Sequence, residues 1–157
     1  MTQILEQSGF DTQNEDTLKD KYLTFSLADE DYGIEIRYVI EIIGIQKITK
    51  IPNLPDFIKG VINLRGKVIP VMDVRARFNI EARDYDERTC IVVVNIDGEA
   101  MGLVVDHVNE VADIPEGQVE PPPSSSHSQA SRYISGIGKM EDEVKILLDV
   151  ERLISQD

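Results

Sequence analysis

One sequence pattern occurs twice in this chain. The segment FIKGVINLRGKVIPVMDVRARF, at Phe57–Phe78, aligns with YISGIGKMEDEVKILLDVERLI, at Tyr133–Ile154, at a constant offset of 76 residues. Upstream, Tyr22–Ile43 aligns with Ile91–Ala112 at an offset of 69. The blocks keep their order, and the seven-residue difference between the offsets equals the difference between connections of 14 and 21 residues. Together these matches indicate an internal duplication, which constrains the architecture of the whole chain.

The duplication predicts one domain built from two lobes. We expect residues 21–154 to form this domain, with lobes at about 22–78 and 90–154. A unit of roughly 60 residues is marginally stable alone, so the lobes should share one apolar interface. Residues 1–20 are polar, acidic and without period, which predicts a disordered N-terminal tail, with a short partner-binding helix as the alternative.

Short alternating segments dominate both repeats. Leu23, Phe25 and Leu27 alternate with less apolar neighbours, a period that is typical of a strand. Pro70 removes a backbone donor, so its strand is expected to be an edge strand or to carry a bulge. About ten short strands with few helices predict a mainly β fold of two small closed or nearly closed barrels. The further strands are expected at 32–36, 45–51, 61–64, 68–72, 90–96, 101–105 and 108–114, with a helical turn at 37–42.

No cluster in the sequence predicts catalysis or a metal site. Asp73 and Asp149 recur at equivalent positions, but each directly precedes a short predicted helix, which indicates N-caps rather than a pair of catalytic carboxylates. Cys90 lies in an apolar run and is expected to be a buried structural thiol. His107 and His127 are not spaced as a ligand pair, and HExxH and CxxC motifs are absent, so we expect neither metal nor cofactor.

The segment Phe57–Phe78 is basic within an acidic chain. Five basic residues and one acid give it a net charge of +4, whereas the whole chain has a net charge of −13. Arg65 lies at or beside a predicted hairpin turn, where packing does not call for an arginine. It is either a scattered solubilising charge or a partner-facing residue whose planar fork meets a carboxylate. Its counterpart in the other repeat is Glu141, so the two lobes should present different surfaces.

Charge and cysteine content exclude several classes of protein. The 29 acidic residues outnumber the 16 basic ones, which argues against nucleic acid and anionic membranes as partners. A single cysteine rules out an intramolecular disulfide and fits a reducing compartment. The start of the chain lacks a signal-peptide pattern and no apolar run is long enough for a membrane helix, so we expect a soluble cytoplasmic protein.

The stretch KGVINLRG, at Lys59–Gly66, together with YGIEIRYVIEIIG and GLVVDHVNEV, resembles the CheW family of chemotaxis coupling proteins. The resemblance runs from about Tyr22 to Ile154. It implies two intertwined five-stranded β-barrel lobes with a few short helices. It further implies a non-catalytic adaptor that couples transmembrane chemoreceptors to the histidine kinase CheA and reaches receptor arrays through these partners.

The resemblance also implies two binding surfaces. The cytoplasmic tip of methyl-accepting chemoreceptors would dock in the groove between the lobes. A flank of the first lobe would pack against the regulatory domain of CheA. The matching receptor positions are Val39, Glu41, Gly60, Asn63, Arg65 and Val108, and the expected kinase positions are Thr49, Ile51 and Leu54.

Two alternatives stay open on the sequence. The chain could be a CheW-like scaffold for a histidine kinase pathway other than chemotaxis. It could instead bind a small molecule, or act as an enzyme, in the groove between the lobes. The latter requires a convergent cluster of titratable groups, whereas the sequence offers scattered acids.

Overall fold

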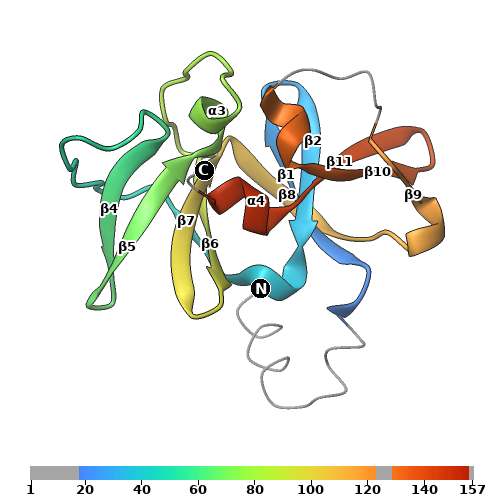
Figure 1. The fold of residues 1–157 in the computed structure, drawn as a ribbon, viewed down its shortest axis with the longest axis horizontal. Helices are drawn as coiled ribbons and strands as arrows, with labels where there is room; N and C mark the ends of the chain where they lie inside the picture. The colour runs from blue at the N-terminus through green and yellow to red at the C-terminus, as the bar shows by residue number, and fades with distance from the viewer. Residues whose placement is uncertain (1–17, 123–128, 156–157) are drawn as a thin grey trace.

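The computed structural model describes residues 18–122 and 129–155. Two β-sheets lie side by side with a short helix between them (Figure 1). The strands are β1 (Lys21–Leu27), β2 (Glu30–Glu35), β3 (Val39–Gly44), β4 (Ile58–Leu64), β5 (Lys67–Asp73), β6 (Cys90–Ile96), β7 (Glu99–Val105), β8 (His107–Asp113), β9 (Val119–Glu120), β10 (Ile134–Met140) and β11 (Glu143–Leu148). The helices are α3 (Val74–Arg77), α4 (Val150–Ile154) and the 3-10 turns η1 (Ile36–Tyr38), η2 (Glu116–Gln118) and η3 (Gln129–Tyr133).

Each sheet combines strands from both sequence repeats. Sheet A has the order β8-β1-β2-β11-β10-β9, and sheet B has the order β3-β6-β7-β5-β4. The first hairpin of one repeat therefore pairs with the remaining strands of the other repeat. When each strand of sheet B is replaced by its counterpart in the other repeat, the order becomes β8-β1-β2-β11-β10. This is the order of the first five strands of sheet A, which confirms the duplication and the intertwined topology.

The register of the strands repeats as closely as their order. In sheet A the parallel ladder pairs Gly33 with Leu147, and in sheet B the equivalent ladder pairs Gly102 with Val71. A Cβ on Gly102 would lie 2.7 Å from a methyl group of Ile91, so both glycines serve close packing at a crossing between the repeats. This equivalence lets any residue in one half be compared with its counterpart in the other.

The prediction of a mainly β fold is confirmed, but the barrels are not closed by continuous hydrogen-bonded ladders. Sheet A has six strands rather than five. In sheet B the outer strands are β3 and β4, and only one isolated bridge, between Thr49 and Val61, links the chain after β3 to β4. In sheet A the chain after β8 is linked to β10 in the same way, through the short strand β9. Both sheets therefore curl toward closure without completing it.

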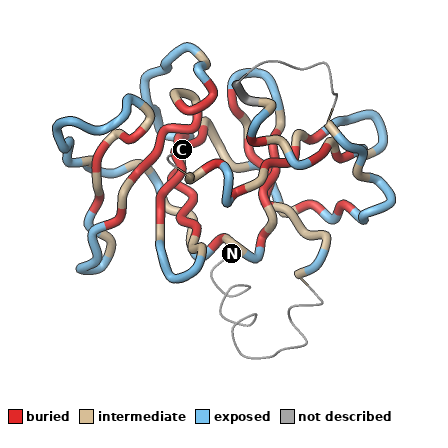
Figure 2. Tube along the Cα trace, in the orientation of Figure 1, coloured by how far each residue is buried: buried red, intermediate tan, exposed pale blue. Residues whose placement is uncertain are grey.

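The main hydrophobic core lies where the two sheets and the helices meet. Buried strand segments from both sheets run toward the centre of the molecule, while the outer loops are exposed (Figure 2). The predicted shared interface is therefore present, since one cluster spans both sheets and both α-helices. Its members include Leu23, Phe25, Met72, Leu103, Val150 and Leu153.

Local predictions had mixed outcomes. The N-cap predictions are confirmed, because Asp73 accepts a hydrogen bond from the Arg75 N–H and Asp149 accepts one from the Arg152 N–H. The helical turn predicted at 37–42 is wrong beyond Tyr38, since β3 begins at Val39. A strand at 45–51 is also wrong: the backbone there makes only the isolated Thr49 bridge.

Two further predictions concern Pro70 and the N-terminus. Pro70 lies in an inner strand, but the parallel ladder with β7 starts at Val71, so its missing donor leaves no gap in that ladder. Most of the predicted tail, residues 1–17, lies outside the described residues, and Leu18 packs partly against the main core. None of the described helices is long and apolar enough to cross a bilayer.

Candidate functional site

The outer strands of sheet B approach each other along a line that we call the seam, made of Glu41, Gln46 and Thr49 on one side and Gly60–Arg65 on the other. The Gln46 Nε2 donates to the Asn63 carbonyl at 3.4 Å. Thr49 and Val61 exchange backbone hydrogen bonds of 2.8 and 2.9 Å. The seam thus gathers four residues predicted to bind receptors, namely Glu41, Gly60, Asn63 and Arg65.

Arg65 crosses the seam from the tip of the β4–β5 hairpin. Positive φ angles at Arg65 (51°) and Gly66 (88°) give a tight turn of the kind that suits hairpins, and the Asn63 Oδ1 accepts the Gly66 N–H at 2.8 Å. Arg65 donates to both carboxylate oxygens of Glu41, through Nη1 at 2.9 Å and through Nη2. These hydrogen bonds hold the pKa of Glu41 below its ordinary value. The Arg65 side chain is still 69% exposed, so the pair lies at the surface.

Sheet A cannot form this ion pair. The counterparts of Glu41 and Arg65 are Glu110 and Glu141, which are both acidic. Glu141 keeps the positive φ of the turn, at 50°. The two sheets therefore share a backbone plan but differ in the chemistry at their edges, as the sequence predicted for the two lobes.

Gly60 lets the chain after β3 approach β4. Its φ is +143°, and a Cβ at this position would lie 2.1 Å from the Thr49 carbonyl oxygen. Backbone must move to admit any side chain there, and the conformation itself is unfavourable for residues with a Cβ. Gly60 therefore contributes to the seam through its backbone and offers no side-chain contact.

We expect Gly60→Ala to open the seam at the Thr49 bridge. The strained conformation and the lost bridge should lower the free energy of unfolding by about 1–3 kcal/mol, measured by urea denaturation. Amide hydrogen exchange should accelerate at Thr49 and Val61. Gly44→Ala is the matched control, since a Cβ on Gly44 meets nothing within 4 Å. Equal stability of the two variants would contradict this role of Gly60.

The other two predicted receptor residues lie apart from the seam surface. Val39 is only 2% exposed and belongs to the main core, so its side chain offers a partner no contact. Val108 lies in sheet A, paired with Phe25, and is half-buried. The expectation that Val39 is a receptor-binding position is therefore corrected as far as direct contact goes, because its side chain packs in the core at the start of β3.

The predicted kinase residues lie in and beside the seam. Thr49 bridges Val61, the neighbour of Gly60. Ile51 and Leu54 follow in the same connection and are 43% and 38% exposed. The two surfaces inferred from the sequence are thus neighbours on sheet B.

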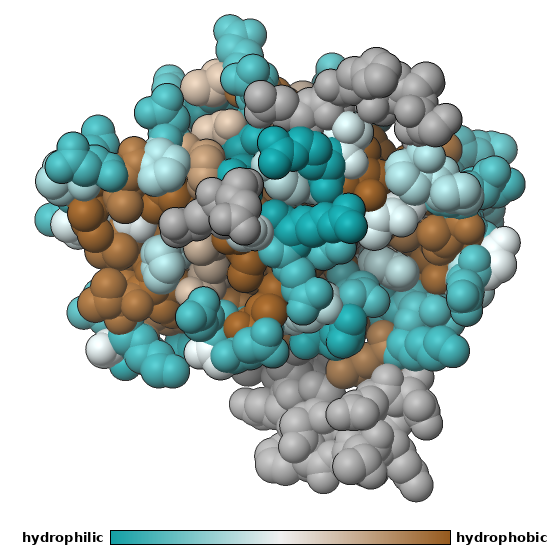
Figure 3. All heavy atoms as spheres, in the orientation of Figure 1, coloured by the Kyte–Doolittle hydropathy of each residue, from teal (hydrophilic) through white to brown (hydrophobic). Residues whose placement is uncertain are grey.

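Exposed apolar side chains concentrate around this part of sheet B. Hydrophobic surface gathers over β4 and β5 at the left of the molecule (Figure 3). Four of the six large apolar residues that are exposed in the described chain lie in β3, in β5 or in the connection between β3 and β4, namely Ile40, Ile51, Leu54 and Val68. Exposed apolar groups next to a polar pair are typical of a protein-binding surface.

Two basic residues of the segment Phe57–Phe78 serve the interior and not a partner. Arg75 pairs with Asp106 through bonds of 2.7 Å, and both side chains are about a tenth exposed. Arg77 is 7% exposed and its guanidinium lies over the rings of Phe57 and Tyr133. Sequence reasoning missed these roles, because neither the Asp106 partner nor the two rings lie near in sequence.

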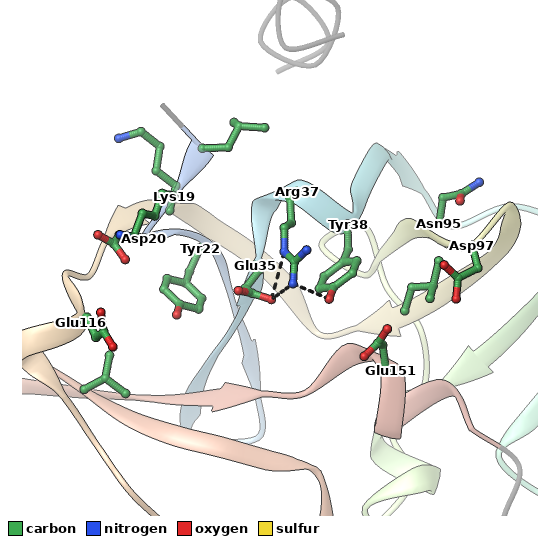
Figure 4. A pocket seen from close by; sticks show the side chains of 14 residues that line it. Lys19, Asp20, Tyr22, Glu35, Arg37, Tyr38, Asn95, Asp97, Glu116 and Glu151 are labelled. Carbon is green, nitrogen blue, oxygen red and sulfur yellow. Dashed lines mark hydrogen bonds and ion pairs between the residues drawn. The ribbon is translucent and has the colours of Figure 1, made fainter. Parts of the chain in front are cut away.

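A cleft lies apart from the seam. It has a volume of about 950 Å³ and is lined by Tyr22, Arg37, Tyr38, Asp97, Glu116, Glu151 and their neighbours (Figure 4). None of the six predicted receptor residues lines it. The expectation that they would line a groove between the lobes is therefore not met by this cleft.

The described residues hold no cluster suited to binding a metal ion. No group of three or more His, Cys, Asp and Glu side chains among them could bind a metal ion. Within residues 18–122 and 129–155, every buried side-chain nitrogen and oxygen has a hydrogen-bond partner. The Tyr85 hydroxyl donates a hydrogen bond to the Asp73 carboxylate. Burial, and then this hydrogen bond, raise the pKa of Tyr85, so its hydroxyl stays neutral.

Comparison with known proteins identifies relatives along the whole described fold. The CheW-like domain family matches residues 21–157. Chemotaxis protein CheW of Klebsiella aerogenes is 39% identical over 142 residues, which cover 90% of this chain and 86% of the relative. Chemotaxis protein CheW of Helicobacter pylori is 31% identical over 144 residues, covering 92% and 86%. The crystal structure of the scaffolding protein TtCheW from Thermoanaerobacter tengcongensis superposes with a TM-score of 0.81 at 41% identity, covering 88% of this chain and 94% of that one.

Proposed function

Because this chain belongs to the CheW-like domain family, we propose that it couples transmembrane chemoreceptors to the histidine kinase CheA. The chain is a non-catalytic chemotaxis adaptor with a mainly β scaffold. Such a protein works by holding partners together, and it transmits a signal when its affinity for a partner differs between that partner's states. A difference of roughly 1–3 kcal/mol is sufficient for useful coupling.

The seam on sheet B is the observation that carries this proposal. It places an exposed arginine–carboxylate pair beside exposed apolar side chains on a chain of strongly negative charge. Apolar contacts supply affinity, whereas charges at the rim set orientation and association rate. Arg65 would meet the receptor's cytoplasmic hairpin, with Glu41 and Asn63 fixing its position.

The remaining receptor residues would act in two ways. Gly60 and Val39 shape the seam from below, since one is a backbone contact and the other is buried. Val108 would extend the docking surface onto sheet A. In this proposal the seam therefore makes the main contribution to receptor docking, and sheet A makes a smaller one.

The kinase would bind the connection that follows β3. Thr49, Ile51 and Leu54 present one hydrogen-bonded backbone segment and two exposed apolar side chains. Because this connection is anchored to β4 at Val61, receptor and kinase would touch neighbouring parts of sheet B. A shift of the hairpin at Arg65 would then move the residues of this chain that bind the kinase.

We expect Arg65→Asp to abolish receptor docking while the protein stays folded. The substitution breaks the pair with Glu41 and places two acids together at the rim. The Kd for a soluble receptor fragment that contains the cytoplasmic tip should rise by at least about tenfold in calorimetry, equivalent to 1.4 kcal/mol. The Kd for the CheA regulatory domain should change by less than about threefold.

Lys67→Asp is the control for this experiment. It makes the same change of charge two residues away, and Lys67 is exposed without an ion pair to any described residue. Wild-type receptor affinity in Arg65→Asp, or an equal loss in Lys67→Asp, would refute the role of the seam.

The alternatives have less support. Chemotaxis is named for both CheW relatives above, so a kinase pathway outside chemotaxis is not favoured. An enzyme or small-molecule binder is not favoured either, because the CheW family is a family of scaffolds.

A further inference from the structure

The duplication allows two ways of pairing the hairpins with the strands that follow them. In the structure the hairpin β1–β2 joins β11 and the hairpin β6–β7 joins β5, so each hairpin pairs with a strand of the other repeat. We call this arrangement the exchanged pairing. In the unexchanged pairing β2 would join β5 and β7 would join β11. Because the two halves share one backbone plan, side chains have to distinguish the two pairings.

The connectivity of the chain does not favour the exchanged pairing. The contact between Asp31 and Lys145 spans 114 residues, and that between Arg75 and Asp106 spans 31. In the unexchanged pairing the equivalent contacts would span 38 residues, from position 31 to 69, and 45 residues, from position 106 to 151. Loop-closure entropy follows the logarithm of the loop length, so the sum over both contacts favours the unexchanged pairing. The exchanged pairing therefore has to be selected by specific contacts.

One such contact is an ion pair across the parallel ladder of sheet A. The Lys145 Nζ lies 2.9 Å from the Asp31 carboxylate, and the Lys145 side chain is only 5% exposed. The counterparts of these residues in sheet B are Ile69 and Ala100, which belong to one apolar cluster. In the unexchanged pairing Asp31 would lie beside Ile69, and Lys145 beside Ala100. Lys145 would keep Glu143, which lies in β11 itself and is therefore present in either pairing.

The second contact is the pair of Arg75 and Asp106, whose side chains are 11% and 9% exposed. Their counterparts are Glu151 and Arg37, which line one cleft from α4 and η1 (Figure 4). The signs are exchanged between the halves, so opposite charges face each other in both. In the unexchanged pairing Arg37 would face Arg75, and Asp106 would face Glu151. Like charges would then meet in both halves, and one of these meetings would be at a buried position.

We propose that these charged positions select the exchanged pairing of the hairpins and exclude the unexchanged one. Both sets act in the same direction, since each gives opposite charges in the exchanged pairing only. A buried charge without its partner is strongly unfavourable, and like charges in contact add to the cost. A buried polar residue has a comparable role in coiled coils, where it fixes one register among otherwise equivalent ones. In this chain the choice is between two repeats of one fold.

Two variants of the full chain test this selection. The inverted variant places opposite charges together in the unexchanged pairing only, and carries Arg37→Asp, Ile69→Lys, Asp106→Arg and Lys145→Ile. The restored variant also moves the partners, so that opposite charges again meet in the exchanged pairing. It carries the same four substitutions and, in addition, Asp31→Ala, Arg75→Glu, Ala100→Asp and Glu151→Arg. Both variants have the composition and net charge of the wild type, so they differ from it only in where the charges lie.

The pairing is measured by NMR spectroscopy on the monomeric fraction of each chain. Two glycines of the parallel ladders, Gly33 in β2 and Gly102 in β7, report it through their cross-strand contacts. In the exchanged pairing Gly33 lies beside Leu147, and Gly102 lies beside Val71. Nuclear Overhauser effects between the backbones of these neighbours therefore identify the pairing, and none of the four residues is substituted in either variant.

We expect the contact of Gly33 to shift from Leu147 to Val71 in the inverted variant. The contact of Gly102 should shift from Val71 to Leu147, and the restored variant should keep both wild-type contacts. Wild-type contacts in the inverted variant would overturn the proposal, because the pairing would then be independent of these charges. Loss of both ladders without the new contacts, or failure of the restored variant to regain the wild-type ones, would also overturn it. The charges would then only stabilise the observed fold, without selecting between two pairings.

Discussion

Asp106→Ala is expected to lower the free energy of unfolding by about 3–5 kcal/mol, because it leaves the Arg75 guanidinium buried without its carboxylate. The Ala28 N–H loses its acceptor in the same step. The pair joins α3 of sheet B to the β1–β2 turn of sheet A, so its loss should also loosen the contact between the sheets. Urea denaturation at pH 7 measures the change, with an unchanged slope showing that compactness is retained.

Arg83→Ala is the control for this prediction. Arg83 also reaches Asp106, but it is 52% exposed, and exposed ion pairs contribute less than about 1 kcal/mol. Replacing both buried partners with apolar residues, as in Arg75→Met with Asp106→Leu, should recover most of the stability lost in Asp106→Ala. If Asp106→Ala and Arg83→Ala were equally stable, the buried pair would not have the role assigned to it.

The pH dependence of this pair has a defined sign. Burial acts to raise the pKa of Asp106, but hydrogen bonds from Arg75 and the Ala28 N–H and the nearby arginine charges outweigh it, so the pKa lies below its ordinary value. The stabilisation is therefore present above the ordinary pKa of an aspartate, near 3.9, and is lost as the pH falls through the lower pKa of the folded protein. The stability difference between the wild type and Asp106→Ala should shrink in that acidic range.

Arg77→Ala is expected to destabilise the protein by about 3 kcal/mol or more. The Arg77 guanidinium lies 4.1 Å from the centre of the Phe57 ring and 4.9 Å from that of Tyr133. Its Nε donates to the Leu153 carbonyl at 3.1 Å, and its Nη2 donates to the Ser155 carbonyl. These carbonyls end α4, where a cation is favoured by the helix dipole.

Arg77→Lys should fail to restore this stability, because an ammonium cannot stack between two rings and reach both carbonyls. Thermal and urea unfolding of Arg77→Ala and Arg77→Lys give the comparison. Wild-type stability in Arg77→Lys would mean that charge alone matters here and that the stacked geometry does not.

The repeated blocks predicted most strands and both helix caps. Tyr22–Ile43 and Ile91–Ala112 indicated which residues are equivalent, and the parallel pairs at Gly33 and Gly102 confirm that equivalence. An alignment along the chain does not say which repeat supplies the neighbour of a given strand. The exchange of hairpins between the sheets consequently became visible only in the structure.

Local errors have a physical cause. Val39–Ile42 has an apolar pattern that fits one helical turn or a strand, and pairing with β6 decides for the strand. Residues 45–51 have a strand-like alternation, yet they pair with β4 only through the isolated bridge between Thr49 and Val61. Tertiary contacts determine the local structure in both segments, and such contacts cannot be read from the sequence of a short segment.

The candidate site was predictable in its residues but less so in its arrangement. Arg65 could be singled out because it breaks the packing pattern of a hairpin turn in a basic segment. Its partner Glu41 lies on the opposite outer strand of sheet B, so the ion pair depends on the curl of the sheet. The burial of Val39 and the internal use of Arg75 and Arg77 depend on the same three-dimensional arrangement.

Simultaneous binding of both partners is the central claim, and co-sedimentation tests it most directly. A receptor fragment in particulate form is mixed with the CheA regulatory domain, and the amount of regulatory domain that sediments is measured with and without this chain. The account predicts that the regulatory domain sediments with the wild-type chain and stays in the supernatant with Arg65→Asp, although that variant still binds the regulatory domain in solution. Sedimentation of the regulatory domain to the same extent with Arg65→Asp, or without any adaptor, would contradict the account.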